Sequence, residues 1–100
     1  MSLFEKQAEF SLMIAKLIIY AYCSGYRITF GDVYAKDGHM NGSLHYSRLA
    51  ADLNLFKDGV YLKDTDDHKV LGEYWEQLGG SWGGRFNDGG HYSLSHNGYK

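Results

Sequence analysis

Apolar residues recur every three or four positions in the first quarter of the chain, which is the spacing of an amphipathic helix. This pattern predicts a helix from about residue 3 to residue 24, with a buried stripe of Phe10, Met13, Ile14, Leu17, Ile18 and Ala21. Gly25 follows the last turn, where glycine favours the left-handed conformation that ends a helix. Cys23 lies within the apolar pattern and is predicted to be a small buried side chain. We therefore expect this helix to be a scaffold that packs against the core.

The middle of the chain alternates loosely between polar and apolar residues, which predicts β-strands. The first strand is expected from residue 26 to 34, with a kink at Gly31. After a polar loop, a second strand is expected over 49–56, with core positions at Leu49, Leu53 and Leu55. A turn over 57–59 then leads into a short antiparallel strand over 60–62.

A second helix is predicted from about residue 66 to 78, with Thr65 as its N-cap and carboxylates in its first turn. Its buried stripe is expected to comprise Val70, Leu71, Tyr74, Trp75 and Leu78. The pair Gly79-Gly80 ends this helix. A glycine-rich loop is expected over 81–90 and a last short strand over 91–94.

The composition indicates one globular domain of 100 residues, because hydrophobic residues make up 44% and aromatic residues 16% of the chain. The net charge of −2, without a basic run, disfavours a nucleic-acid partner. A single cysteine excludes an internal disulfide. The apolar run over 12–23 is too short and too closely flanked by charge to span a membrane. It also lacks the basic start and the cleavage site of a signal peptide, because acidic residues precede it and Tyr20-Ala21-Tyr22 is a poor cleavage site. We expect a monomer made in the cytoplasm, with a membrane-surface role of the first helix as a minor alternative.

Two imidazoles and two carboxylates are the candidate catalytic groups: His45, Asp52, Asp88 and His91. A catalytic zinc site uses such a set, with three protein ligands, an open position and a carboxylate that handles protons. His45 and Asp52 are seven residues apart, so a regular strand would point them to opposite faces. A loop or bulge must lie between them if both reach one metal ion. The spacing alone leaves simpler alternatives open, in which Asp52 caps a turn and Asp88 forms an Asx turn.

The order of these residues adds a resemblance to a known family. The segments SLHYSRLAADLNLF and WGGRFNDGGHYSL contain Ser-x-His, Ala-x-Asp and Asp-x-x-His in that order. This arrangement resembles the zinc D,D- and L,D-peptidases of bacterial cell walls and their phages, which include D-alanyl-D-alanine carboxypeptidases and phage L-alanyl-D-glutamate endolysins. The resemblance covers most of the chain after Tyr26. It implies the α+β Hedgehog/D,D-peptidase fold, with a small antiparallel sheet and two main helices. It further implies that one Zn²⁺ is held by His45, Asp52 and His91, and that Asp88 is the general base.

The function implied by the resemblance is zinc-dependent hydrolysis of a peptide bond in peptidoglycan, by a single peptidase domain spanning residues 1–100. The small size fits a phage enzyme that is released at lysis or carried in the virion and acts on the cell wall. Ser43, Arg48 and Trp82 are expected to contact the substrate. Packing of the loop is an equal alternative for Trp82 and for Arg85.

One feature departs from the family pattern. Many members carry, upstream of Ser-x-His, an arginine that grips a substrate carboxylate. The corresponding region here has no arginine, and the candidates to replace it are Arg27, Lys36 and Arg48.

Three other histidines are weaker metal candidates. His39 lies before the Ser-x-His motif, His68 lies in the second predicted helix and is expected to be exposed, and His96 lies in the C-terminal tail. Two further classes stay open for the whole chain: an inactive relative that binds metal and acts as an interaction module, and a structural phage protein without metal. Metal content separates the last class from the others, and hydrolysis of cell walls separates the enzyme from the inactive relative.

Overall fold

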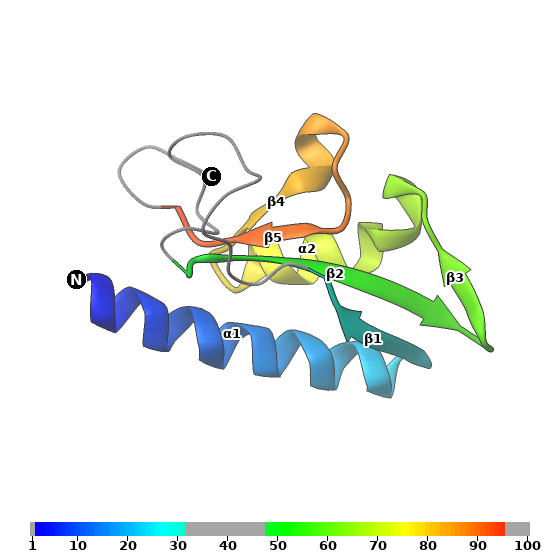
Figure 1. Ribbon diagram of the computed structural model, residues 1–100, viewed down its shortest axis with the longest axis horizontal. Coiled ribbons are helices and arrows are strands. Elements are labelled where there is room, and N and C mark those ends of the chain that lie inside the picture. Colours follow the sequence, from blue (N-terminus) through cyan, green and yellow to red (C-terminus); the bar gives the residue numbers. More distant parts are fainter. Residues whose placement is uncertain (1, 32–47, 96–100) are drawn as a thin grey trace.

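Two helices lie against a small antiparallel β-sheet in the computed structural model, which describes residues 2–31 and 48–95 (Figure 1). This arrangement confirms the predicted α+β class. In chain order the elements are α1 (Leu3–Cys23), β1 (Tyr26–Phe30), β2 (Ala50–Lys57), β3 (Val60–Leu62), the 3-10 helix η1 (Thr65–His68), α2 (Lys69–Gln77), β4 (Ser81–Trp82), the 3-10 helix η2 (Gly83–Phe86) and β5 (His91–Ser93).

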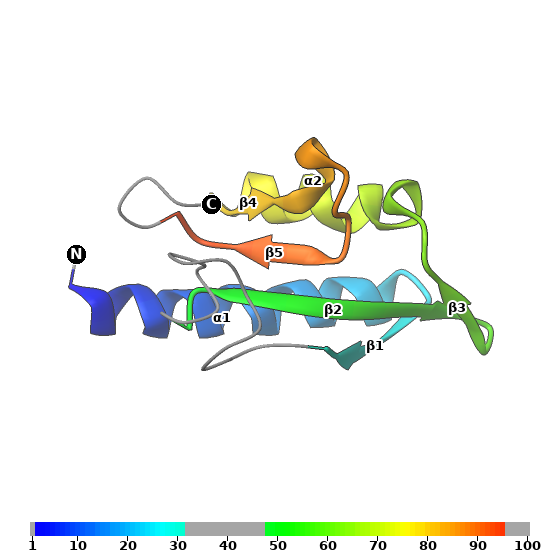
Figure 2. The ribbon, with the colours of Figure 1, turned by 45° about the horizontal axis from the view of Figure 1, so that its top comes forward.

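β2 is the central strand of the sheet, and its two edges have different partners (Figure 2). β1 pairs antiparallel along one edge, with Tyr26 opposite Lys57 and Phe30 opposite Leu53. The other edge is shared, because β5 pairs with the first half of β2 and β3 pairs with its second half. β4 pairs with β5. The second edge of β2 therefore opens around Asn54, between the end of one partner and the start of the next.

Alternate residues of β2 pack against the helices, because successive side chains of a strand point to opposite faces. The inward residues and the α1 stripe form one buried cluster that includes Phe10, Met13, Leu17, Ala51, Leu53 and Leu55. On the opposite face of β2, Asp52 and Asn54 stay partly exposed. One face of the sheet is therefore the core, and the other is available for polar chemistry.

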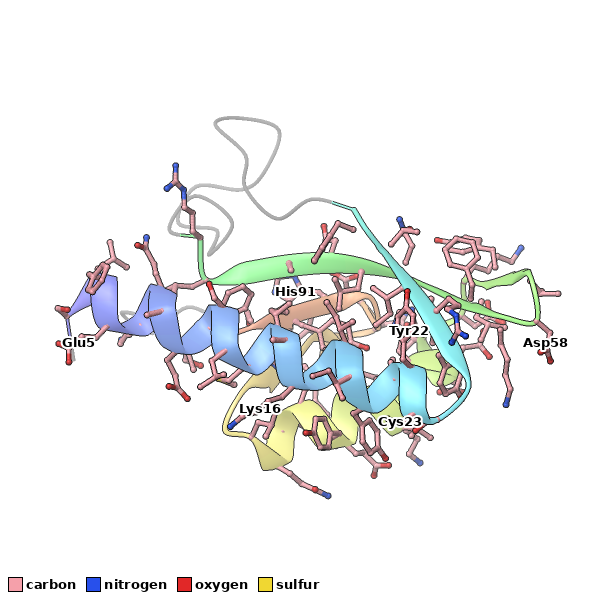
Figure 3. All side chains as sticks on the ribbon, turned by 90° about the horizontal axis from the view of Figure 1, so that it is seen from below. Glu5, Lys16, Tyr22, Cys23, Asp58 and His91 are labelled. Carbon is pink, nitrogen blue, oxygen red and sulfur yellow. The ribbon has the colours of Figure 1, made fainter. Side chains whose placement is uncertain are left out.

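The two helices pack side by side over the core (Figure 3). The rings of Phe10 and Trp75 meet edge to face with centroids 5.7 Å apart, and those of Tyr20 and Tyr74 stack at 4.1 Å. The fully buried Trp75 donates its indole N–H to the carbonyl of Ser93 over 2.9 Å. This bond satisfies the polar atom of a buried indole and fastens α2 to β5.

α1 begins with a capping box, in which Ser2 and Glu5 exchange hydrogen bonds of 3.0 and 3.1 Å. It ends before Gly25, whose φ of +93° confirms the predicted left-handed conformation. Cys23 is exposed, so its predicted burial is wrong. It follows the buried Ala21 by two residues, about 200° further round the helix, and therefore points away from the core (Figure 3). Among the described residues, no helix has the length and hydropathy needed to cross a membrane.

The second helical region begins differently from its prediction. Its first turn is the 3-10 helix η1, and regular α-helix starts only at Lys69. The N-cap is Asp64 and not Thr65, and the backbone N–H of Asp64 donates to Oδ2 of Asp67 over 3.2 Å. Thr65 is instead available to bind the loop before β5.

The buried stripe of α2 is narrower than predicted. Leu71 and Trp75 are buried. Val70 directly precedes Leu71 on the helix, lies beside the buried stripe and is 47% exposed. Gly79, with a φ of +98°, ends the helix as predicted.

The connections confirm the predicted hairpin and revise two boundaries. Asp58 and Gly59 both have positive φ, as a type I′ turn requires between β2 and β3. β1 ends at Phe30, and the remainder of the predicted strand from residue 32 lies outside the described residues. The predicted loop over 81–90 is wrong in part, because its first six residues form β4 and η2.

Candidate active site

Asp52 and His91 lie opposite each other in the paired strands β2 and β5. Nδ1 of His91 is 3.4 Å from Oδ1 of Asp52, and the exposed fractions of the two side chains are 11% and 37%. Next to this pair, the N–H of Leu53 donates to the carbonyl of Gly90 over 2.8 Å and holds the two strands together. The strand register thus directs an imidazole and a carboxylate to the same face of the sheet (His91 is labelled in Figure 3).

The pair has the chemistry and spacing of two zinc ligands. Two ligand atoms on a tetrahedral zinc ion, each bonded at about 2.0–2.1 Å, are roughly 3.3 Å apart. The observed separation of 3.4 Å is close to this value. The third predicted ligand, His45, lies outside the described residues. Within 2–31 and 48–95, no three side chains of His, Cys, Asp or Glu gather as a metal site. The donor set therefore fits zinc for Asp52 and His91, and the three-ligand assignment stays a prediction.

Asp88 lies in the turn that leads into β5. Its N–H donates to the carbonyl of Gly83 over 2.8 Å, and its own carbonyl accepts the N–H of His91 over 3.1 Å. The preceding Asn87 takes the left-handed conformation, with a φ of +64°. These contacts fix the backbone of the predicted general base relative to a predicted ligand, while the carboxylate itself stays exposed.

The loop before β5 that carries Asp88 is closely packed, and hydrogen bonds from two neighbouring elements hold it in place. A Cβ atom on Gly83 would lie 2.2 Å from the carbonyl oxygen of Asp88, so a larger residue does not fit there. Trp82 is 4% exposed, and its indole N–H donates to the carbonyl of Gly89 over 2.8 Å. From the side of η1, Oγ1 of Thr65 accepts the N–H of Gly89 over 3.2 Å.

A polar pocket of about 240 Å³ opens where β3 and β5 leave the edge of β2 uncovered. We call it the β3–β5 pocket, and its polar lining includes Asp52, Asn54, Lys63, His68 and Asp88. The structure thus brings Asp52 and Asp88 to one cavity, although 36 positions separate them in the sequence. A water molecule and part of a peptide have space beside both carboxylates.

His68 is only 4% exposed, so its predicted exposure is wrong. Its Nδ1 lies 2.9 Å from the hydroxyl oxygen of the fully buried Tyr92. Burial lowers the pKa of His68, and the carboxylates of Asp67 and Asp88 oppose that effect. The residue pattern contained one signal of burial, because His68 precedes Leu71 by three positions and falls on the same helical stripe.

The three predicted substrate contacts are placed differently. Ser43 lies outside the described residues. Arg48, with a φ of +57°, lines a hollow over the first turns of α1 with Phe4 and Gln7, and not the β3–β5 pocket. Trp82 packs the loop, which is the other of its two predicted roles. A contact of any of the three with substrate stays a prediction.

The other basic candidates are tied to their surroundings or fall outside the described residues. The guanidinium of Arg85 donates to Glu76 over 2.6 and 2.9 Å and therefore links η2 to α2. Arg27 lies over the ring of Tyr22 at 4.6 Å, at the end of α1. Lys36, His39 and His96 are not among the described residues.

Comparison with known protein families places the predicted zinc ligands and general base within a family match. The model of the D-alanyl-D-alanine carboxypeptidase family matches residues 37–94, which is more than half of the chain. The matched segment includes His45, Asp52, Asp88 and His91. No curated protein matches the chain significantly.

Proposed function

The chain belongs to the D-alanyl-D-alanine carboxypeptidase family of peptidases, and from this premise we propose that it is a zinc-dependent hydrolase of peptidoglycan stem peptides. The observation that carries the proposal is the pair formed by Asp52 and His91, with its ligand atoms 3.4 Å apart, inside the matched segment. The same premise supports the Hedgehog/D,D-peptidase fold for this α+β chain.

We assign the metal to His45, Asp52 and His91. Zinc, when bound there, would polarise the peptide carbonyl and lower the pKa of a water molecule. Asp52 supplies a carboxylate from the rigid central strand, and His91 supplies Nδ1 from its partner strand. Placing two ligands on paired strands fixes their separation before any metal is present, which lowers the cost of assembling the site.

Asp88 is the general base and acid of the proposed reaction. Its carboxylate is exposed at the β3–β5 pocket, so water and peptide reach it. It accepts the proton of the water molecule that attacks the peptide carbonyl, and it then donates that proton to the leaving amine. The bonds to Gly83 and His91 hold its backbone during both transfers.

The substrate is a peptide of the bacterial cell wall, and Ser43, Arg48 and Trp82 are its proposed contacts. The resemblance to phage endolysins supports a phage-encoded monomer that is released at lysis or carried in the virion. Cleavage of an L,D- or a D,D-bond is compatible with this proposal, because both involve the same attack on a peptide carbonyl.

A metal analysis paired with a digest of purified peptidoglycan tests the proposal. We expect one zinc ion per chain, and new amino groups released from walls only when zinc is present. Zinc binding without hydrolysis would indicate an inactive relative that acts as an interaction module. Absence of stoichiometric zinc would favour a structural protein of a phage particle and overturn the proposal.

A further inference from the structure

His68 places one edge of a buried imidazole at the β3–β5 pocket. Its Nδ1 edge meets the hydroxyl of Tyr92, 2.9 Å away. Its other edge faces Gly90, where an added Cβ atom would lie 3.9 Å from Cε1 and 4.0 Å from Nε2. Because Gly90 has no side chain, no Cβ atom covers that edge, and His68 is among the residues that line the pocket although the residue is 96% buried.

The hydrogen bond to Tyr92 determines which nitrogen carries the proton. Tyr92 is fully buried, and a buried hydroxyl needs an acceptor. Nδ1 of His68 is the acceptor that the structure offers, and burial lowers the pKa of His68, which favours the neutral ring. In a neutral imidazole that accepts at Nδ1, Nε2 carries the hydrogen. An N–H donor at Nε2 therefore faces the pocket, and the hydrogen bond between Nδ1 and Tyr92 fixes its direction.

A positive charge lies in the same pocket. Lys63 follows β3 directly, one position beyond the pair Leu62 and Leu55, and therefore lies beside Asn54 at the open edge of β2. Among the residues that the structure describes around the pocket, Lys63 alone is a cation at neutral pH, given the neutral His68. A fixed N–H donor and a flexible ammonium in one cavity are the partners that a carboxylate prefers.

We propose that His68 and Lys63 form a carboxylate subsite of the β3–β5 pocket, with Nε2–H of His68 donating to the anion and Lys63 pairing with it. The inference rests on the proposed peptidase function, because it assigns the position of a substrate carboxylate beside the bond that Asp88 acts on. Two carboxylates of a stem peptide have this chemistry: the C-terminal one and the free carboxylate of the glutamate residue.

Three matched peptides test the subsite on the full-length chain. One stem pentapeptide carries both free carboxylates, the second is amidated at its C-terminus, and the third is amidated at glutamate. Binding is measured by calorimetry on the metal-free chain, and kcat/KM is measured on the zinc-loaded chain. We expect one amide to bind about tenfold or more weaker, the scale of a lost charge-assisted hydrogen bond, and this amide identifies the carboxylate.

Two variants separate the subsite from the fold. His68→Asn keeps an amide near the Nδ1 position, which can still bond Tyr92, but removes the pocket-facing end. Lys63→Met removes the charge at similar length. In each variant, the ratio of the affinity for the carboxylate peptide to that for the amidated peptide should fall close to one. The affinity for the amidated peptide itself should not decrease. Lys57→Met, an exposed lysine of the same hairpin outside the pocket, should keep the preference. His68→Gln, which restores a nitrogen near Nε2, should recover part of it.

The outcomes distinguish this inference from the proposed function. Hydrolysis with an unchanged carboxylate preference in both His68→Asn and Lys63→Met overturns the subsite and leaves the peptidase intact. Equal binding of all three peptides to the unmodified chain also overturns the subsite. If the zinc-loaded chain cleaves none of them, the proposed function fails, and calorimetry alone decides whether a carboxylate is bound. Should His68→Asn not fold, Lys63→Met decides.

Discussion

Asp52 and His91 are 39 positions apart in the chain, yet Oδ1 of one and Nδ1 of the other lie 3.4 Å apart across β2 and β5. The two strands hold this pair by backbone hydrogen bonds on both sides, from Leu53 to Gly90 and from Leu94 to Leu49. A slip of one residue in either strand would turn one side chain toward the core. The candidate site therefore depends on strand register as much as on residue type.

The first prediction concerns the metal. Replacing His91 with Ala removes Nδ1 from the paired strands, and we expect the variant to lose stoichiometric zinc. His68→Asn is the matched control, because His68 is a buried histidine that bonds Tyr92 and lies outside the proposed ligand set. Zinc per chain is measured by emission spectroscopy after dialysis. Full zinc occupancy in His91→Ala would show that the ligand assignment is wrong.

The second prediction concerns the loop before β5. In Gly83→Ala the new Cβ atom would lie 2.2 Å from the carbonyl oxygen of Asp88 and 2.7 Å from Cβ of His91. Because both neighbours belong to a closed turn, we expect a loss of at least about 1–3 kcal/mol in the free energy of unfolding. Zinc binding and hydrolysis should weaken together, since the turn positions both residues.

Gly31→Ala is the milder comparison, because the nearest atom to its Cβ would be the carbonyl oxygen of Asp52, at 3.1 Å. Denaturant unfolding of both variants measures the difference. Equal stability of Gly83→Ala and the unmodified chain would mean that the turn is not closed in the way described.

The sequence pattern was sufficient for most of the fold. Helical spacing located α1 and its stripe, and alternation located β2 with its core leucines, because both elements have one face in the core. The sequence pattern was less successful in predicting which individual side chains are buried. The prediction for Cys23 failed for a local reason, because the residue ends an apolar run but lies off the buried stripe of α1. His68 has a polar ring but is buried, where the hydroxyl of Tyr92 supplies a hydrogen-bond partner.

The site shows the same division. Residue types and order were enough to single out Asp52 and His91, and the structure places them together. The β3–β5 pocket could not be predicted, because it arises where two strands share one edge of β2, which is a property of sheet topology. Lys63 enters the site only through that topology.

The third prediction concerns stability at acid pH. The pKa of His68 in the folded chain is lowered, first by burial. Below the ordinary value of about 6.5, the unfolded chain therefore binds a proton at His68 that the folded chain does not bind. The free energy of unfolding should fall as the pH is lowered through this value, and this contribution to pH dependence should vanish above it.

His68→Asn isolates the effect of this group from that of the other histidines. Between about pH 7.5 and pH 5.5, the midpoint of thermal unfolding should decrease less in the variant than in the unmodified chain. Circular dichroism at several pH values gives the comparison. Identical decreases in both proteins would show that His68 does not remain neutral when the chain is folded.

The last prediction separates a ligand from a base. Losing a ligand should cost metal and activity together, whereas losing the base should cost activity alone. Asp88→Asn keeps the size and hydrogen-bonding capacity of the side chain, but the amide does not accept a proton near neutral pH. We expect zinc content close to that of the unmodified chain, and peptidoglycan cleavage reduced roughly a hundredfold or more, the scale of lost general acid–base catalysis.

The backbone of Asp88 is held by Gly83 and His91 through main-chain atoms, so this substitution leaves the turn intact. Asp58→Asn, at the exposed hairpin tip (Figure 3), makes the same chemical change away from the pocket and should leave both zinc and cleavage unchanged. Release of amino groups from purified walls measures the rate. If Asp88→Asn cleaves as fast as the unmodified chain, Asp88 is not the base; if it loses zinc, Asp88 is a ligand and another group takes the proton.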